Sequence, residues 1–380
     1  MTQTAPSVPV SIDDPTNVRI LSVSEDQLSG FQRDPLGVIV ERSGVGEAVV
    51  VERLRAMLEA GVIRRIRQTL IANRLAEGAL VAWQLPRERL NDGFDYLFEQ
   101  DPASGHVVIR TTDSETPGSG FRLWTTVKVP QGYSIERHCE VLARTIGAET
   151  FRIMPAKALF TLGVGHVRRR GTEPGSRSSE PGQTMFDEIT PLDEVDWQVL
   201  NALKGELEVS EVGADLWRAR AEQAGLPFER FCEFAESLDE RGVLGRFSTF
   251  LEHSKPLPGG ERVTSYNALF HWAVPEGKEL EAGREVGRHD IMTHAYWREA
   301  GPEFGNVNIM GVAHSSTDRD YLLEHKAAID AHLAEASIPV LYSSVFWGGR
   351  SEIKPSEIAP DAYERWCREH YVDPSSMRID

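Results

Sequence analysis

The stretch THAYWREAGPEFGNVNIMGVAH, from Thr293 to His314, decides the fold that we predict for this chain. Two runs in which apolar and polar residues alternate, Ile291–Arg298 and Phe304–His314, flank a turn signal at Ala300–Glu303. This pattern predicts a β-hairpin. Because side chains alternate between the faces of a strand, the hairpin sorts its polar residues by face.

On the first expected strand, His294, Tyr296 and Arg298 share a face. On the second strand the residues that share a face are Asn306, Asn308, Met310, Val312 and His314. Either histidine taken alone is typical of an exposed or internally hydrogen-bonded residue. Together the imidazoles, the guanidinium and the amides exceed what a core needs, and they favour a functional site.

The hairpin resembles the siroheme decarboxylases. These enzymes act in heme and heme d1 biosynthesis and are related to the Lrp/AsnC regulators. The resemblance is carried by Thr293, His294, Tyr296 and Arg298 on the first strand. On the second strand it is carried by Asn306 or Asn308, then Met310 and His314. It extends with gaps over roughly residues 20–350, in the order expected of a fused pair of subunits.

Two internal echoes indicate a duplication. GVIRRIRQTLI at Gly61 aligns without a gap to GVLGRFSTFLE at Gly242, 181 positions later. His106 and Arg110 repeat the spacing of His294 and Arg298 at an offset of 188. Two pairs of matching segments, separated by nearly the same number of residues, predict a tandem repeat.

Each copy begins with three helical patterns and a strand, the layout of a winged helix-turn-helix. The clearest amphipathic helix is Ala48–Ala60, which ends at Gly61, and Val62–Ala72 predicts the first β-wing. Strand–helix–strand–strand–helix–strand follows, at about 78–86, 88–100, 105–111, 120–129, 133–146 and 149–164, and again at about 264–274, 278–287, 289–298, 304–314, 317–335 and 338–348. This βαββαβ order is ferredoxin-like.

The resemblance therefore implies an α+β fold, a duplicated winged helix and AsnC-type domain whose two four-stranded sheets pack together as an intramolecular pseudo-dimer. The predicted boundaries are a flexible tail 1–17, winged helix 18–77, ferredoxin-like domain 78–167, Gly/Ser/Pro-rich linker 168–190, winged helix 191–262, ferredoxin-like domain 263–351 and C-terminal tail 352–380. We expect this tail, with Tyr363, Trp366 and Tyr371, to be ordered.

Composition narrows the class of protein. A length of 380 residues, 41% of them hydrophobic, predicts two or more globular domains. No run approaches the roughly 18 apolar residues of a membrane helix, and the first residues lack the pattern of a secretory signal. Cys139, Cys232 and Cys367 are far apart and odd in number, which predicts no disulfide framework and favours a cytoplasmic location.

The resemblance also implies a chemistry. Siroheme carries eight carboxylates and an iron, so its pocket needs cations, amides and apolar walls. The expected catalytic residues are His294, His314 and Arg298, with both histidines as possible axial ligands of the substrate iron. The expected substrate-binding residues are Tyr296, Asn306, Asn308, Met310, His106, Arg110, Arg122, Trp124 and Lys157. No cofactor is expected beyond the iron-bearing tetrapyrrole substrate.

The first copy departs from the motif, because Val108 replaces the tyrosine and no histidine matches His314. A structural or substrate-gripping role and a second active pocket both stay open for it. His271, His289, His325 and His332 are typical of core-edge or exposed residues. Arg168, Arg169 and Arg170 form either a solvated cluster or a guide for an anionic tetrapyrrole.

Two other functions compete with decarboxylation of siroheme. One is an Lrp/AsnC-like DNA-binding regulator, and the other is a non-catalytic heme or siroheme carrier. The net charge of −17 disfavours binding to DNA, as do the acidic residues around Arg53 and Arg55, and around Arg230 and Arg241, on the expected recognition helices. A further homodimer of the whole chain stays open.

Overall fold

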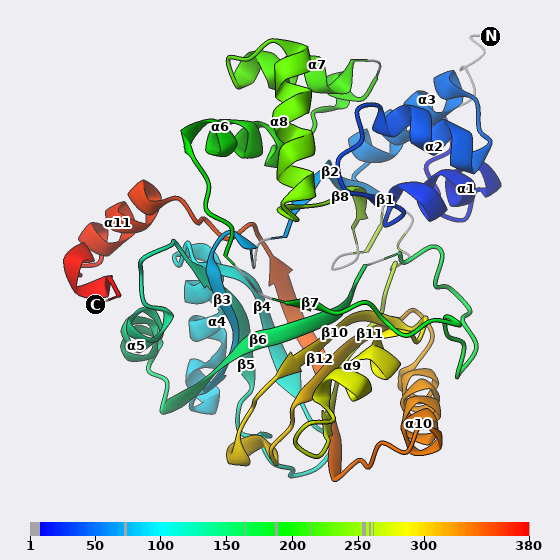
Figure 1. Cartoon of the computed structure of the whole chain (residues 1–380). Helices are drawn as coiled ribbons and strands as arrows, with labels where there is room; N and C mark the ends of the chain where they lie inside the picture. The colour runs from blue at the N-terminus through cyan, green and yellow to red at the C-terminus, as the bar shows by residue number, and fades with distance from the viewer. Residues whose placement is uncertain are drawn as a thin grey trace. The chain divides into compact units, whose positions relative to one another are not determined.

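The computed structural model describes residues 8–71, 74–163, 165–186, 189–213, 215–252, 256–257, 260 and 262–379. The chain divides into two compact units, each assembled from separate stretches of sequence. We call Met1–Ala72, Gly163–Arg170 and Thr190–Thr264 the helical unit. Asn73–Leu162, Gly171–Ile189 and Ser265–Asp380 form the barrel unit. Figure 1 labels the elements of both.

The helical unit takes three helices and one long strand from each half of the chain. The first half supplies α1 (Pro15–Ser24), β1 (Leu28–Ser29), α2 (Pro35–Ser43), α3 (Glu47–Glu59) and β2 (Ile63–Leu70). The second half supplies α6 (Glu194–Lys204), the 3-10 helix η3 (Val209–Glu211), α7 (Leu216–Gln223), α8 (Phe228–Glu240) and β8 (Leu244–Leu251). The amphipathic helix predicted at Ala48–Ala60 is α3.

The repeated Gly-Val motif has a physical reason. Gly61 and Gly242 have φ angles of 72° and 69°, and each follows the third helix of its half. A left-handed residue without a Cβ ends a helix and releases the chain into a strand. The strands β2 and β8 then pair with each other in a sheet of order β1-β8-β2. The prediction of a β-wing within each copy is therefore wrong for the described residues.

The first half of the barrel unit contains β3 (Glu77–Gln84), η2 (Arg87–Arg89), α4 (Leu90–Glu99), β4 (Ser104–Thr111), β5 (Leu123–Val129), α5 (Ile135–Ile146), β6 (Thr150–Leu162) and β7 (Met185–Phe186). The second half contains β9 (Tyr266–Ala273), α9 (Glu279–Gly287), β10 (Met292–Arg298), η4 (Pro302–Phe304), β11 (Ile309–Ser315), α10 (Arg319–Glu335), β12 (Tyr342–Ile353), α11 (Pro360–Glu369) and η5 (Pro374–Met377). The predicted βαββαβ order occurs in each half.

The sheet of this unit is continuous across the two halves. Among the described residues its strand order is β10-β11-β9-β12-β4-β5-β3-β6-β7, and β10 also pairs with β6. The strands from β10 to β6 therefore close into a barrel. We predicted two separate sheets, and that prediction is wrong. β6 pairs with β3 of its own half and with β10 of the other half, and β12 pairs with β9 of its own half and with β4 of the other half.

Three apolar clusters follow from this closure. Outward-facing residues of β3, β4 and β5 pack with α4, α5 and α11, where Tyr363 and Trp366 of the C-terminal tail are buried. Outward-facing residues of β9, β10 and β11 pack with α9 and α10, the helices beside these strands in Figure 1. The third cluster, the interior cluster, joins both halves inside the barrel: Ala82, Val108, Phe121, Trp124, Met154, Leu269, Ala300, Phe304, Val307, Met310 and Phe346.

The predicted linker is divided between the units. Residues 171–182 lie along α9 and α10, where the N–H of Gly182 donates to the carbonyl of Arg284 at 3.0 Å. The N–H of Ser178 likewise donates to the carbonyl of Arg288. Residues 163–170 belong to the helical unit. Tyr371, in contrast to Tyr363, is fully exposed in the C-terminal tail.

Candidate functional site

Strands β10 and β11 form the predicted hairpin. Tyr296 lies opposite Met310, and His294 lies opposite Val312. The turn is longer than predicted, because it contains η4 and closes through a hydrogen bond from the N–H of Asn306 to the carbonyl of Gly301. The open end of the hairpin carries both of its histidines.

The predicted face of β10 carries a ladder of side chains. The rings of His294 and Tyr296 are stacked, with centroids 6.0 Å apart and 14° between their planes. The Cζ atom of Arg298 lies 4.5 Å from the centroid of Tyr296, a cation–π contact. Nη1 of Arg298 donates to the carbonyl of Met154 at 2.5 Å. These contacts hold the guanidinium and both rings in a fixed order.

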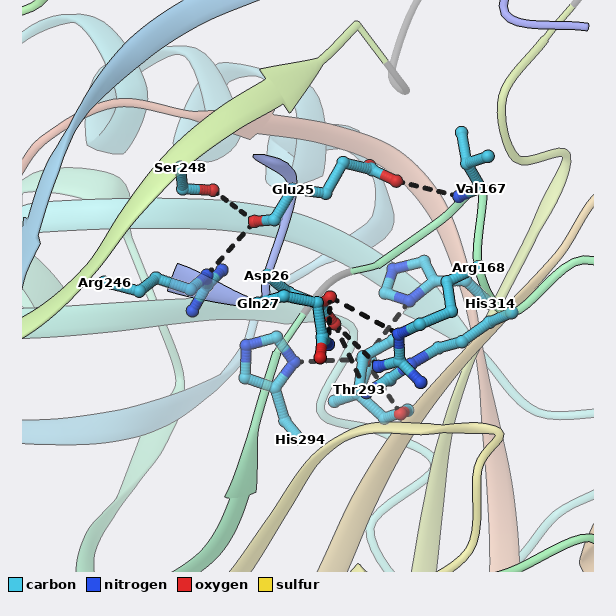
Figure 2. A network of polar contacts seen from close by, with 12 residues as sticks. Glu25, Asp26, Gln27, Val167, Arg168, Arg246, Ser248, Thr293, His294 and His314 are labelled. Atoms are coloured by element: carbon cyan, nitrogen blue, oxygen red, sulfur yellow. Dashed lines mark hydrogen bonds and ion pairs between the residues drawn. The ribbon is translucent and has the colours of Figure 1, made fainter. Parts of the chain in front are cut away.

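Thr293 connects the two histidines of the hairpin (Figure 2). Its hydroxyl lies 3.1 Å from Nδ1 of His294 and 3.3 Å from Nδ1 of His314. The same hydroxyl donates to the carbonyl of Val312 at 3.0 Å. One buried threonine therefore faces the same ring atom of both imidazoles.

The other nitrogen of His314 faces the start of β9. Its Nε2 lies 2.7 Å from Nδ2 of Asn267. Oδ1 of Asn267 accepts a hydrogen bond of 2.9 Å from Nη1 of Arg110, on β4 of the first half. Burial lowers the pKa of Arg110 to about 10. The structure thus joins Arg110 of the first copy to His314 of the second through one amide.

The two amides predicted for this surface lie elsewhere. Asn306 is exposed in the turn, with a φ of 57°. Asn308 is buried, and its side chain both donates to the carbonyl and accepts from the N–H of Val274, at 2.8 and 2.9 Å. Asn308 precedes His314 by six residues, roughly 20 Å of extended strand. We therefore correct the expectation that these amides share a site with the histidines.

Met310 and Trp124 lie in the interior of the barrel. Both side chains are fully buried in the interior cluster. The ring of Trp124 packs edge-on against Phe346 and Phe304, and its Nε1 donates to the carbonyl of Phe121 at 2.7 Å. Both are core residues in this structure, and Met310 lies directly opposite Tyr296 of the hairpin.

The remaining candidates of the first half are dispersed. His106 is half-buried on β4, with Nε2 at 2.8 Å from Oγ of Ser351. Arg122 is half-buried just before β5, and its carbonyl accepts from the N–H of Arg110. Lys157 is exposed, forms an ion pair with Glu299 and lies over the outward-facing ring of Trp297. Lys157 therefore lies with Trp297 on the outer face of the barrel, away from the face that carries His294 and Tyr296.

The four other histidines weighed from the sequence, His271, His289, His325 and His332, are all buried in the barrel unit. His271 points into the barrel, where burial and the positive charge of Arg110 lower its pKa to about 3. His289 lies 2.7 Å from His332, which is 2.9 Å from Glu285. Burial and the neighbouring His332 lower the pKa of His289 to about 3. His325 lies 3.0 Å from the carbonyl of Thr172.

The arginine run at 168–170 is engaged by carboxylates of the helical unit. Nη2 of Arg168 lies 2.8 Å from Asp26, and Arg170 forms an ion pair with Asp13 (Figure 2 shows Asp26 with Arg168). The neighbouring Glu25 accepts from the N–H of Val167 at 2.8 Å, and burial raises its pKa to about 8. These contacts favour a structural role for the run over a guide for tetrapyrrole.

Asn267 was missed from the sequence, and so was the linking role of Thr293. The available signal was Gly348 on β12, within the pair Gly348-Gly349. A Cβ at Gly348 would lie 2.8 Å from Oδ1 of Asn267, so only glycine leaves room for the amide. The described residues contain no group of three or more His, Cys, Asp or Glu that could hold a metal ion. No described helix is long and apolar enough to cross a membrane.

Comparison with known proteins finds one matching family model and several relatives. The sequence model of the AsnC-like ligand binding domain matches residues 75–161. A siroheme decarboxylase of Hydrogenobacter thermophilus is 24% identical over 343 residues, covering 89% of this chain and 93% of the relative. The NirDL subunit of the Paracoccus pantotrophus siroheme decarboxylase is 25% identical over 76% of this chain and 83% of its own.

Solved structures show the same fold. The crystal structure of the siroheme decarboxylase NirDL superposes with a TM-score of 0.64 at 20% identity, covering 93% of this chain and 97% of that one. The same enzyme in complex with an iron-uroporphyrin III analogue gives 0.63 at 19% identity, with 94% and 98% covered. This chain, an α+β protein with a fold of the Lrp/AsnC type, is similar over most of its length to siroheme decarboxylases.

Proposed function

We propose that this protein removes acetate carboxyl groups from siroheme and yields 12,18-didecarboxysiroheme and CO2. The observation that carries the proposal is the hairpin, which places His294 and His314 around one threonine and continues the face of His294 into Tyr296 and Arg298. The chain also aligns with curated siroheme decarboxylases over most of its length.

The reaction breaks the bond between the acetate methylene and its carboxyl carbon. The electron pair stays on the methylene carbon, which takes up a proton and becomes a methyl group. An arginine suits the grip on a carboxylate because its fork stays charged, so we assign that role to Arg298. An imidazole suits the proton step because its ordinary pKa lies near neutrality, so His294 and His314 are the candidates. The substrate also brings an iron, for which an imidazole is a suitable ligand.

The finer architecture belongs to the same proposal. We assign the halves of the helical unit to two helix-turn-helix modules whose strands β2 and β8 form one shared sheet, and the halves of the barrel unit to two fused AsnC-type subunits in a pseudo-dimer. The exchange of β6 and β12 between the halves supports this, because each strand makes the same crossing.

A DNA-binding regulator is disfavoured by the arginines of the expected recognition helices. Arg53 pairs with Asp14 at 3.2 Å, and Arg55 donates to the carbonyl of Val212 at 2.7 Å. Arg230 pairs with Glu233 and Arg241 with Asp196, both at 2.5 Å. Charges that are already compensated within the protein contribute little to binding phosphates.

The test is to add siroheme to the protein without oxygen and to follow both the visible absorption and the mass of the tetrapyrrole. We expect a shifted spectrum and then the loss of two carboxyl groups as CO2. A shifted spectrum with unchanged mass would identify a carrier and contradict the proposal. His294→Ala distinguishes chemistry in the site from decarboxylation in solution.

A further inference from the structure

One face of the β1-β8-β2 sheet carries a group of arginines. Arg65 and Arg67 alternate on β2, and Arg246 lies on β8. Arg67 is opposite Ser248 in the register, and Arg65 is opposite Phe250, so these side chains share one face. The Cζ atoms of all three arginines lie 5.7 to 6.0 Å from the centroid of the Phe250 ring. We call these three arginines around Phe250 the arginine face.

The arginine face is short of carboxylates. Arg65 pairs with Glu206 at 3.0 Å. Nε of Arg246 donates to the backbone carbonyl of Glu25 at 3.3 Å, which is a neutral acceptor. Nε of Arg67 is buried and has no hydrogen-bond partner among the residues that the structure describes. Burial and the neighbouring Arg65 lower the pKa of Arg67 to about 10, as expected of a positive charge that its surroundings do not compensate.

The acidic residues beside Arg246 do not neutralise the arginine face either. Burial raises the pKa of Glu25 to about 8, so this carboxyl is mostly protonated at pH 7. Its side chain accepts from the N–H of Val167 at 2.8 Å. Asp26 forms an ion pair with Arg168 at 2.8 Å. The arginine face therefore keeps an excess of positive charge, in a chain whose net charge is −17.

Three guanidinium groups around one ring cost stability, because like charges repel and an unpaired buried charge is unfavourable. Apolar side chains would fill the same face of a sheet at a lower cost. An anionic ligand would offset the repulsion, and the planar fork of arginine binds a carboxylate through two parallel hydrogen bonds. Arg65 is about 6% exposed, so the face admits the side-chain carboxylates of a small molecule more readily than the backbone of a DNA duplex.

We infer that the arginine face binds carboxylate groups of a tetrapyrrole, and that this ligand completes the hydrogen bonding of Arg67. The inference rests on the proposed function for the identity of the ligand. It adds binding residues of the helical unit to those of the β10–β11 hairpin, and it assigns them no part in breaking the bond. A local excess of positive charge also attracts an anion that the chain as a whole repels.

The test measures binding without turnover, with metal-free uroporphyrin III as the probe. This porphyrin carries the same acetate and propionate groups as siroheme, and its fluorescence reports binding. Loss of one charged hydrogen bond typically weakens binding roughly 10- to 100-fold, so we expect the Kd of Arg67→Gln to rise by that factor. Arg67→Lys keeps the charge without the fork, so its Kd should fall between the two. This variant also serves if Arg67→Gln does not fold.

Arg218→Gln is the matched control. Arg218 is exposed on α7 of the same unit. It also lies over a phenylalanine ring, with its Cζ 5.3 Å from the centroid of Phe228, and it pairs with Asp215 at 3.6 Å. Because this arginine is outside the arginine face, we expect the Kd of Arg218→Gln to equal that of the parent.

The stability of the ligand-free protein separates a binding role from a structural one. Removing an unpaired charge that repels its neighbours should raise the urea midpoint of Arg67→Gln, whereas loss of a structural contact would lower it. A ligand that binds the folded state stabilises it. Uroporphyrin III should therefore raise the midpoint of the parent more than that of Arg67→Gln.

Equal Kd values for the parent and Arg67→Gln would overturn the inference, and so would a lowered urea midpoint of this variant. Displacement of the porphyrin by citrate at equal concentration would do the same, because it would assign the face to any small anion. Decarboxylation of siroheme by Arg67→Gln with the KM of the parent would overturn the inference alone. The expected change in Kd without release of CO2 from siroheme by the parent would instead refute the proposed function and leave the arginine face as a binding site.

Discussion

His271 is a polar residue that lies among apolar side chains inside the barrel. Its side chain is fully buried, and neither ring nitrogen has a hydrogen-bond partner within the described ranges. The rings of Phe346, Trp124 and Phe304 surround it at 4.8 to 6.3 Å. With a folded-state pKa of about 3, the ring is neutral at pH 7. The burial of this imidazole is explained neither by a role in the candidate site nor by a hydrogen bond within the described ranges.

We predict that His271→Phe stabilises the protein by about 1–3 kcal/mol at pH 7, because an unpaired buried polar group is removed. The parent should also lose stability as the pH falls from about 6.5 toward 3, because the unfolded histidine binds a proton in this range and the folded one does not. The variant should lack this part of the pH dependence. Urea unfolding at pH 7 and pH 5 measures both effects, and a variant less stable than the parent at pH 7 would contradict the prediction.

Single residues were predictable from the sequence where the signal is local. Alternation along one strand correctly places His294, Tyr296 and Arg298 on one face. Asn267 could not be found this way, because its role depends on which strands neighbour β9. Asn308 fits the same alternation as His314, but its amide pairs with the backbone of Val274, a contact between distant segments.

At the scale of elements, helix α9 is fitted closely onto β6. A Cβ at Gly283 would lie 1.9 Å from the ring of Phe160, and one at Gly287 would lie 2.8 Å from Cβ of Phe160. The helix can approach the sheet this closely only because both positions are glycine. This packing supports the strand that pairs with β10 along the candidate site.

We predict that Gly283→Ala destabilises the protein by about 1–3 kcal/mol through overpacking. Adding Phe160→Leu should restore part of the loss, because the two residues are in contact and their effects should not add. Thermal unfolding of the single and double variants gives the coupling. Gly46→Ala, where a Cβ meets nothing within 4 Å, is the control. Strictly additive effects would show that Gly283 and Phe160 do not limit each other.

At the scale of the whole molecule, the order of elements was predictable and their closure was not. Periodicity and turn signals gave the βαββαβ order of both halves. They could not show that β6 and β12, of 13 and 12 residues, each pair with two halves. The sequence of a strand indicates which of its faces are buried. The backbone N–H and C=O groups along its edges can bond equally well to a strand of either half, so the sequence does not indicate the partner. The pairing of β2 with β8 escaped prediction for the same reason.

We predict no appreciable binding of DNA at physiological salt. The net charge of −17 and the paired arginines of α3 and α8 oppose contact with phosphates. A gel-shift assay with the promoter region of the protein's own gene measures this. Nanomolar affinity there would favour the regulator over the enzyme.

The central claim is that the β10–β11 hairpin decarboxylates siroheme through its histidines. The most direct measurement is the rate of CO2 release from siroheme by His294→Ala and by His314→Ala beside the parent protein, with circular dichroism to confirm that all three are folded. Loss of a positioned acid–base group typically costs roughly 10²- to 10⁴-fold in rate, and we predict a decrease of that size in at least one variant. Release of CO2 at the parent rate by both folded variants would contradict the claim and place the chemistry elsewhere.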